Sequence, residues 1–418
     1  MVDADQTFVI VGGGLAGAKA AETLRAEGFT GRVILICDER DHPYERPPLS
    51  KGFLLGKAER DSVFVHEPAW YANHDIELHL GEPVTAIDRA ARAVRFGDGT
   101  TVHYDKLLLA TGAEPRRLDI PGTGLAGVHH LRRLAHAERL KGVLAALGRD
   151  NGHLVIAGAG WIGLEVAAAA REYGAEVTVV APSPTPLYSV FGPEVGELFA
   201  ELHRAHGVRF HFGARLTEII GQDGMVLAAR SDDGEEHPAH DVLAAIGAAP
   251  RTALAEAAGL ELAAEGGGIA VDEGLRTSDP DIYAAGDVAA FPHPLFGTRL
   301  RVEHWANALN GGPAAARAML GRQVTYDRVP YFFSDQYDMG MEYSGWAPPG
   351  SYDQVLIRGD AGKRQFIAFW LKDGRVLAGM NVNVWDVTEQ IQRLVRSRAE
   401  VDVEALADPS RPLDSLVP

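Results

Sequence analysis

The stretch Phe8–Gly17, FVIVGGGLAG, decides the fold, because an apolar β-branched run passes directly into a G-x-G-x-x-G pattern. Helix formers fill residues 18–26, and a second apolar run at 32–37 ends at Asp38. Strand, glycine turn, helix, strand and acid follow one another in the order of a βαβ unit. The stretch therefore predicts a dinucleotide site.

Each position of this pattern has a physical role. Gly12 permits the tight turn, Gly14 lets the backbone approach a pyrophosphate, and Gly17 lets helix and strand pack closely. Asp38 follows Gly17 by 21 residues, near the roughly 20 expected for an acid that binds a ribose. Glycine-rich turns also occur for backbone reasons alone, so the two strands and the acid carry the prediction.

A second fingerprint follows the apolar run 153–157. It reads GAGWIG at 158–163, continues as a helix past Glu165 to Gly174, and is followed by a strand at 176–180. A second dinucleotide is thus implied. The position for its ribose-binding acid is Ala181, with no acid or arginine close behind, so the pattern favours NADH and leaves NADPH open.

Composition limits the other possibilities. A length of 418 residues suggests about three domains, and a net charge of -17 argues against general nucleic-acid or anionic-lipid binding. The single cysteine, Cys37, excludes a Cys-x-x-Cys redox pair, so redox chemistry needs a cofactor. The histidines show no short ligand spacing, and we expect no metal. The acidic start, residues 1–7, and the lack of a long apolar run predict a soluble, cytoplasmic protein without a membrane segment.

Four further segments resemble one family. The most specific is YERPPLSK at 44–51, and the others are LLLATG at 107–112, VLAAIG at 242–247 and TSDPDIYAAGD at 277–287. With both fingerprints, they make nearly the whole chain similar to the FAD-dependent NAD(P)H ferredoxin reductases of bacterial oxygenase systems, which are related to apoptosis-inducing factor.

The resemblance implies an α/β fold with two Rossmann-like domains of the glutathione-reductase type and a C-terminal α+β domain. The nicotinamide domain is expected to be inserted into the flavin domain. The expected boundaries are 1–115 with 243–323 for the FAD-binding domain, 116–242 for the NAD(P)H-binding domain, and 324–418 for the C-terminal domain.

The implied activity is electron transfer from NAD(P)H through FAD, one electron at a time, to a small ferredoxin of the [2Fe–2S] kind. That ferredoxin would serve a cytochrome P450 or a dioxygenase. The alternatives are a rubredoxin reductase, an NAD(P)H oxidase, or a redox-sensing flavoprotein like apoptosis-inducing factor.

The resemblance also assigns individual residues. Lys51 is expected near flavin N5 and Glu165 at the nicotinamide entrance, while Trp305 shields the flavin ring; a solvated lysine, a surface glutamate and a core tryptophan are the alternatives. Arg46 is expected to hold FAD, and Asp287 its ribityl hydroxyls, although a surface ion pair and plain turn geometry also fit. The remaining expected cofactor contacts are Leu15, Ala16, Pro48, Ala110, Thr111, Gly112, Gly158, Gly160, Trp161, Ile162, Gly163, Gly247, Gly286, Glu303 and His304.

An acidic ferredoxin would need a local basic patch on this acidic chain. Two groups of arginines are candidates, and a solvated helix face is the alternative for the second. They are Arg299 and Arg301, and Arg393, Arg396 and Arg398.

Overall fold

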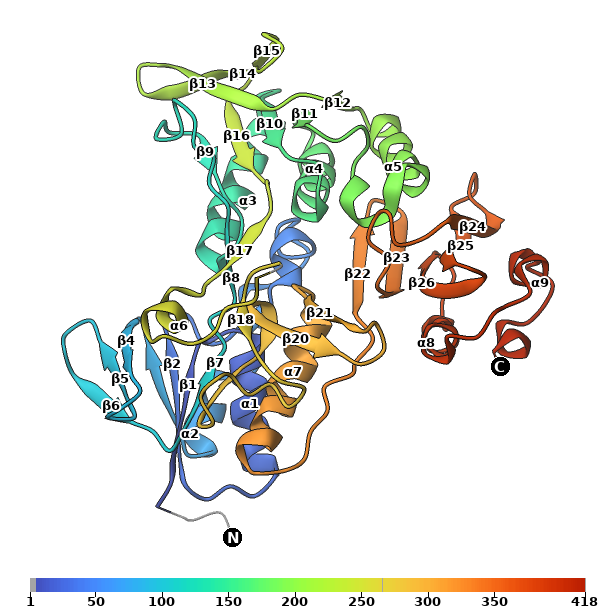
Figure 1. Cartoon of the computed structure of the whole chain (residues 1–418). Helices are drawn as coiled ribbons and strands as arrows, with labels where there is room; N and C mark the ends of the chain where they lie inside the picture. Colours follow the sequence, from blue (N-terminus) through green and yellow to red (C-terminus); the bar gives the residue numbers. More distant parts are fainter. Residues whose placement is uncertain (1–4, 265, 418) are drawn as a thin grey trace. The chain divides into compact units, whose positions relative to one another are not determined.

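The computed structural model describes residues 5–264 and 266–417, so Met1–Ala4 of the acidic start lie outside the described residues (Figure 1). The chain divides into two compact units. The first unit comprises Met1–Arg46, Arg60–Glu114 and Ala248–Pro330; the second comprises Pro47–Glu59, Pro115–Gly247 and Tyr331–Pro418.

The first unit is built on a five-stranded parallel sheet of order β19-β7-β1-β2-β3. Val9 of the central strand pairs in register with Ile34 on one side and Leu107 on the other, and all three side chains are fully buried. Burial on both faces explains why these strands are continuous apolar runs. The strands are β1 (Thr7–Val11), β2 (Arg32–Cys37), β3 (Ile76–Leu80), β7 (Lys106–Leu109) and β19 (Ile282–Ala284).

Helices α1 (Leu15–Ala26) and α7 (Trp305–Met319) pack side by side in this unit (Figure 1). Their backbones approach so closely that a Cβ on Gly312 would lie 2.1 Å from the carbonyl oxygen of Ala16. The other elements of this region are α2 (Pro68–Asn73), α6 (Ala253–Ala257), β4 (Val84–Asp88), β5 (Ala93–Phe96), β6 (Thr101–His103), β8 (Ala113–Pro115), β17 (Ala248–Pro250), β18 (Ile269–Ala270), β20 (Ala289–His293), β21 (Thr298–Arg301), and the 3-10 turns η2 (Arg60–Val63) and η3 (Gly286–Val288).

The second unit contains its own parallel sheet, of order β12-β11-β10-β16-β9, and a small antiparallel sheet, β13-β14-β15. Helix α4 ends at Gly174, whose φ of 94° is the left-handed conformation that glycine adopts without strain. The elements are η1 (Pro47–Ser50), β9 (Val128–His129), α3 (Leu134–Arg149), β10 (His153–Ala157), α4 (Trp161–Tyr173), β11 (Glu176–Ala181), α5 (Tyr188–Ala205), β12 (Val208–Phe212), β13 (Leu216–Gln222), β14 (Met225–Ser231), β15 (Glu236–Pro238) and β16 (Asp241–Ala244).

A five-stranded antiparallel sheet of order β22-β23-β26-β25-β24 completes the second unit. It shares a core with α5: the rings of Phe191 and Trp370 stack 5.4 Å apart, and the Trp370 indole N–H donates to the Phe191 carbonyl at 3.1 Å. The elements are β22 (Tyr331–Gln336), β23 (Met339–Gly345), β24 (Gln354–Asp360), β25 (Gln365–Lys372), β26 (Arg375–Val382), α8 (Thr388–Ser397), α9 (Val403–Ala407) and η4 (Leu413–Leu416).

The predicted fold class is confirmed: two parallel α/β sheets, each opened by a glycine fingerprint, and a C-terminal antiparallel sheet with helices. Among the described residues, no helix combines the length and apolar character needed to span a membrane.

Candidate dinucleotide sites

The first glycine fingerprint forms a tight turn between β1 and α1. Gly12 has a φ of +125°, and a Cβ there would lie 2.1 Å from the Ala110 carbonyl oxygen. A Cβ on Gly17 would lie 2.0 Å from the Gly12 oxygen. Gly14 differs: it caps α1 in extended conformation, and a Cβ placed on it would meet no described atom within 4 Å apart from those of its chain neighbours. The turn therefore leaves open space at the helix N-terminus, where a phosphate is favoured.

Leu15 and Ala16, the next predicted contacts, form the buried first turn of α1. Ala110 continues β7, and its N–H donates to the Val11 carbonyl at 2.8 Å. Helix α1 thus places Leu15 and Ala16, and the sheet places Ala110.

Asp38, the predicted ribose acid, lies just beyond β2 and pairs with Arg251 at 3.0 Å. Two contacts fix Arg251: its N–H donates to the Gly112 carbonyl at 2.9 Å, and its carbonyl accepts from Thr111 Oγ1 at 2.8 Å. The structure thus brings Asp38 together with two predicted turn residues. Arg251 was not predicted as a site residue, because no motif marks a basic residue after the short strand β17.

Arg46 lies in a cluster of polar groups. Its guanidinium is 3.3 Å from both a Glu39 carboxylate oxygen and the Tyr44 hydroxyl, and Tyr44 donates to Glu39 at 2.7 Å. Burial lowers the pKa of Arg46, but its interactions with Tyr44, Glu39 and Asp287 outweigh that effect and raise it. Asp287 follows Gly286, whose φ is 78°. Arg46 and Asp287 therefore face one another electrostatically, as two residues of one site would.

Two polar contacts hold the residues around the start of α7. Glu303 forms an ion pair with Arg301, and the Trp305 indole N–H donates to Glu45 Oε2 at 3.2 Å. His304 is the N-cap residue of α7; burial lowers its pKa to about 4, although the nearby Asp287 acts to raise it. Glu45 was not predicted as a site residue, although it lies inside the most specific motif.

The second fingerprint repeats the geometry of the first. Gly158 has a φ of +104°, and a Cβ there would lie 2.4 Å from the Ala245 oxygen; a Cβ on Gly163 would lie 2.3 Å from the Gly158 oxygen. At Gly160, which caps α4, a Cβ would meet no described atom within 4 Å apart from those of its chain neighbours. Gly247, with a φ of +95°, accepts from the Arg116 N–H at 2.9 Å. This turn also leaves room for a phosphate at a helix N-terminus.

The two residues that follow Gly160 differ in their surroundings. Trp161 packs edge-on against Phe191 and Phe332, with ring centroids 5.4 and 5.0 Å apart. Ile162 is 38% exposed. Trp161 is therefore anchored in the hydrophobic core of the second unit, whereas Ile162 is available at the surface.

Lys51 and Glu165 form an ion pair within the second unit. Lys51 lies one turn beyond Pro48, whose carbonyl accepts its N–H at 3.1 Å. Glu165 is 5% exposed and accepts further hydrogen bonds from Ser50 and, at 2.7 Å, from Ser334. Three hydrogen-bond donors thus fix the position of this buried carboxylate. The two serines were not predicted.

The candidate docking arginines are engaged within the chain. Arg299 donates to the carbonyls of Val271, at 2.7 Å, and Ala290. Arg393 pairs with Asp414. Their guanidinium groups therefore have structural partners, a possibility that spacing along the sequence does not reveal.

Two fingerprint turns, each open at its middle glycine and each at the carboxyl edge of a parallel sheet, define an oxidoreductase that binds two dinucleotides. The chain belongs to the pyridine nucleotide-disulphide oxidoreductase family, whose pattern matches residues 6–312; residues 331–417 match a reductase C-terminal domain.

Individual relatives match this chain over nearly its whole length. The chain is 36% identical to putidaredoxin reductase CamA of Pseudomonas putida, covering 100% of this chain and 98% of the relative. It is 39% identical to the ferredoxin--NAD(+) reductase component of the anthranilate 1,2-dioxygenase system of Burkholderia cepacia, over 96% of this chain and 97% of the relative. The crystal structure of the covalent putidaredoxin reductase-putidaredoxin complex matches with a TM-score of 0.94 and 36% identity, over 99% of this chain and 98% of that chain.

Proposed function

We propose that the chain is a flavin-dependent ferredoxin reductase. It takes electrons from NAD(P)H and passes them through FAD, one at a time, to a small [2Fe–2S] ferredoxin that serves a cytochrome P450 or another oxygenase. The observation that carries this function is the pair of open fingerprint turns, at Gly14 and Gly160, in a chain with a single cysteine. Because Cys37 is buried and alone, no disulfide relays the electrons.

FAD supplies the conversion of a two-electron hydride into single-electron steps. The first unit fits this cofactor: the turn at Gly12–Gly17 offers its N–H groups to the pyrophosphate, Arg46 adds positive charge, and Asp38 and Asp287 accept hydrogen bonds from hydroxyl groups. The second fingerprint, Gly158–Gly163, fits the nicotinamide dinucleotide in the same way. We accordingly assign residues 1–115 with 243–323 to FAD, 116–242 to NAD(P)H, and 324–418 to a C-terminal domain.

The paired Lys51 and Glu165 are proposed to act in hydride transfer. The ammonium supplies positive charge where reduction leaves negative charge, and Glu165, fixed by Ser50 and Ser334, keeps that ammonium in position. Trp305, held by Glu45, is proposed to present its flat ring to the flavin. In this assignment no side chain acts as a nucleophile.

The preferred nucleotide is NADH, since Ala181 ends β11 and no arginine follows it. We place the protein in the cytoplasm, where NADH and small ferredoxins are available.

The function is tested with FAD-loaded protein and a panel of purified carriers. NADH should reduce the bound flavin rapidly, and adding a [2Fe–2S] ferredoxin should raise cytochrome c reduction strongly, while rubredoxin or oxygen alone should not. Faster transfer to rubredoxin, or NADH consumption by oxygen with no effect of any ferredoxin, would assign the chain to one of the alternative activities instead.

A further inference from the structure

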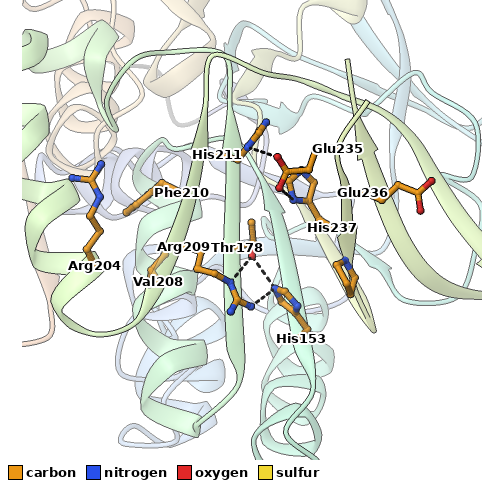
Figure 2. A pocket seen from close by; sticks show the side chains of 11 residues that line it. His153, Thr178, Arg204, Val208, Arg209, Phe210, His211, Glu235, Glu236 and His237 are labelled. Carbon is orange, nitrogen blue, oxygen red and sulfur yellow. Dashed lines mark hydrogen bonds and ion pairs between the residues drawn. The ribbon is translucent and has the colours of Figure 1, made fainter. Parts of the chain in front are cut away.

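A pocket of about 670 Å³ lies at the amino-terminal edge of the parallel sheet in the second unit (Figure 2). His153, the first residue of β10, lines it, whereas the second fingerprint follows the last residue of the same strand, Ala157. The pocket therefore lies at the opposite end of β10 from the proposed nucleotide site.

Three potential metal ligands converge at one side of this pocket (Figure 2). His211 Nδ1 lies 3.3 Å from Glu235 Oε2, and His237 Nδ1 lies 3.8 Å from Glu235 Oε1. One ligand atom from each residue can be chosen so that all lie within 4.8 Å of one another. Zinc bonds of about 2.1 Å in a tetrahedron place neighbouring ligand atoms about 3.4 Å apart, so small side-chain rotations would close the site.

The outer nitrogens of both imidazoles have partners that turn the Nδ1 atoms inward. His211 Nε2 lies 2.7 Å from Asp233 Oδ2, and His237 Nε2 lies 3.3 Å from Ser231 Oγ. Ser231 in turn donates to the other oxygen of Asp233 at 2.6 Å. A carboxylate on the outer nitrogen of a histidine is the arrangement that orients metal-binding imidazoles and increases their basicity.

The cluster combines a rigid interior with an open side. His237 lies on β15 and is 5% exposed, while His211 lies on β12 and is partly buried. Glu235, in the turn before β15, is 58% exposed and leaves a path from solvent. Ligands fixed on strands and one accessible carboxylate are compatible with an ion that enters from water and keeps a water ligand.

We propose that His211, Glu235 and His237 form a binding site for a divalent transition metal, with Zn²⁺ the best fit. Two imidazole nitrogens and one carboxylate oxygen bind the ion, and a water molecule completes a tetrahedron. This proposal departs from the expectation of no metal, which was based on the lack of short ligand spacing along the sequence. His211 and His237 are far apart in the chain and meet only because β12 and β15 lie close together.

The ion would connect an edge strand of the parallel sheet, β12, to the turn between β14 and β15. Because the unfolded chain does not hold these three ligands together, binding should stabilise the folded state. The site does not depend on the proposed electron transfer, so its test needs no carrier protein.

The test uses tag-free, full-length, FAD-loaded protein stripped of metal with a chelator. Titration with Co²⁺ should produce the visible absorption of a tetrahedral cobalt complex, saturating at one equivalent, and Zn²⁺ should abolish it by displacement. Zn²⁺ should also raise the thermal unfolding midpoint by a few degrees. Absence of saturable binding, or an octahedral spectrum that Zn²⁺ does not displace, would overturn the site.

A matched pair of variants locates the ion. Glu235→Gln removes a ligand at an exposed position and should weaken Co²⁺ binding by more than about 100-fold, whereas Glu236→Gln, whose carboxylate points away to Arg230, should bind like the parent (Figure 2). Asp233→Asn should lower the affinity for Co²⁺ by about 10- to 100-fold, because the His211 imidazole loses the carboxylate that orients it. Equal affinity in Glu235→Gln and Glu236→Gln would overturn the proposal even if the protein binds cobalt elsewhere.

Discussion

Lys51 and Glu165 form an ion pair across 114 residues of sequence, and both side chains are largely shielded from water, with exposed fractions of 15% and 5%. Ser50 and Ser334 complete the hydrogen bonding of the carboxylate. Removing one member of a buried pair leaves the other charge without compensation, which is far more costly than losing a surface pair.

We therefore expect Lys51→Ala to reduce the rate of flavin reduction by NADH at least about tenfold and to lower the free energy of unfolding by about 3 kcal/mol. Lys57→Ala, which breaks the exposed ion pair with Glu172, is the control. It should change the rate of flavin reduction and the free energy of unfolding only slightly. Stopped-flow absorbance and chemical unfolding measure the two effects. An unchanged reduction rate in Lys51→Ala would make the pair structural only.

The glycines of the first fingerprint should separate into two kinds. Gly14→Ala should fold normally but retain less FAD, because its Cβ meets no described atom beyond its chain neighbours and would occupy the space proposed for the pyrophosphate. Gly17→Ala should instead destabilise the fold, since its Cβ would lie 2.0 Å from the Gly12 oxygen. The flavin-to-protein absorbance ratio and the thermal midpoint distinguish them; full FAD content in Gly14→Ala would contradict the placement.

The end of β11 should set the nucleotide preference. We expect kcat/KM for NADH to exceed that for NADPH, and we expect Pro182→Arg, at an exposed position after Ala181, to shift the ratio toward NADPH by about tenfold through a charge-assisted hydrogen bond to the 2′-phosphate. Steady-state kinetics with both nucleotides measure the ratio. A parent enzyme that works better with NADPH would overturn the assignment.

His203 should make the second unit sensitive to acid. It is fully buried between α5 and β22, where burial lowers its pKa to about 4 from 6.5; the hydrogen bond to Gln336, 2.7 Å long, acts in the opposite direction. Between pH 6.5 and 4 the unfolded chain binds the proton and the folded chain does not, so stability is lost as pH falls through that window, by up to about 3 kcal/mol.

Thermal midpoints measured from pH 7.5 to 4.5 test this dependence. His203→Gln should flatten the decline below pH 6.5. Identical profiles for the parent and His203→Gln would place the acid sensitivity elsewhere.

Cys37 should behave as an inert core residue. It is 2% exposed, and burial, with a smaller contribution from Asp38 and Glu39, raises the pKa of its thiol to about 12 from 9.0. The thiolate fraction at neutral pH is then about a thousandfold smaller than for a free cysteine, so a thiol reagent should modify native protein only on unfolding. If the reagent instead modified native protein rapidly and flavin was lost, Cys37 would be accessible, and strands β1 and β2 would have to separate in the folded state.

The local order of residues was enough to predict both fingerprints. An apolar strand followed by G-x-G-x-x-G can be predicted from neighbouring residues alone, because contacts within one βαβ unit require the glycines. Gly17 packs on Gly12, and Gly163 packs on Gly158. The C-terminal α+β domain, by contrast, was expected only from the family resemblance, because β25 is buried along six consecutive residues and shows no alternation.

The partners of the site residues were not available from the sequence. Arg251 beside Asp38, Glu45 beside the Trp305 indole, and Ser334 on Glu165 all lie far from their partners in the chain. Arg251 and Ser334 belong to no motif, and the motif that contains Glu45 does not indicate its partner. Likewise, the histidines of the proposed metal site come from different sheets.

The sequence by itself determined the class of fold, the two glycine turns for dinucleotides and the need for a redox cofactor. Apolar strands and glycine turns are local properties of the chain, and the single cysteine is a property of its composition. Only the tertiary structure decided which charges are paired, which histidines are buried and which ligands converge. Hydrogen bonds and ion pairs act over a few ångströms in space, and the packing of sheets, rather than distance along the chain, brings those groups within reach.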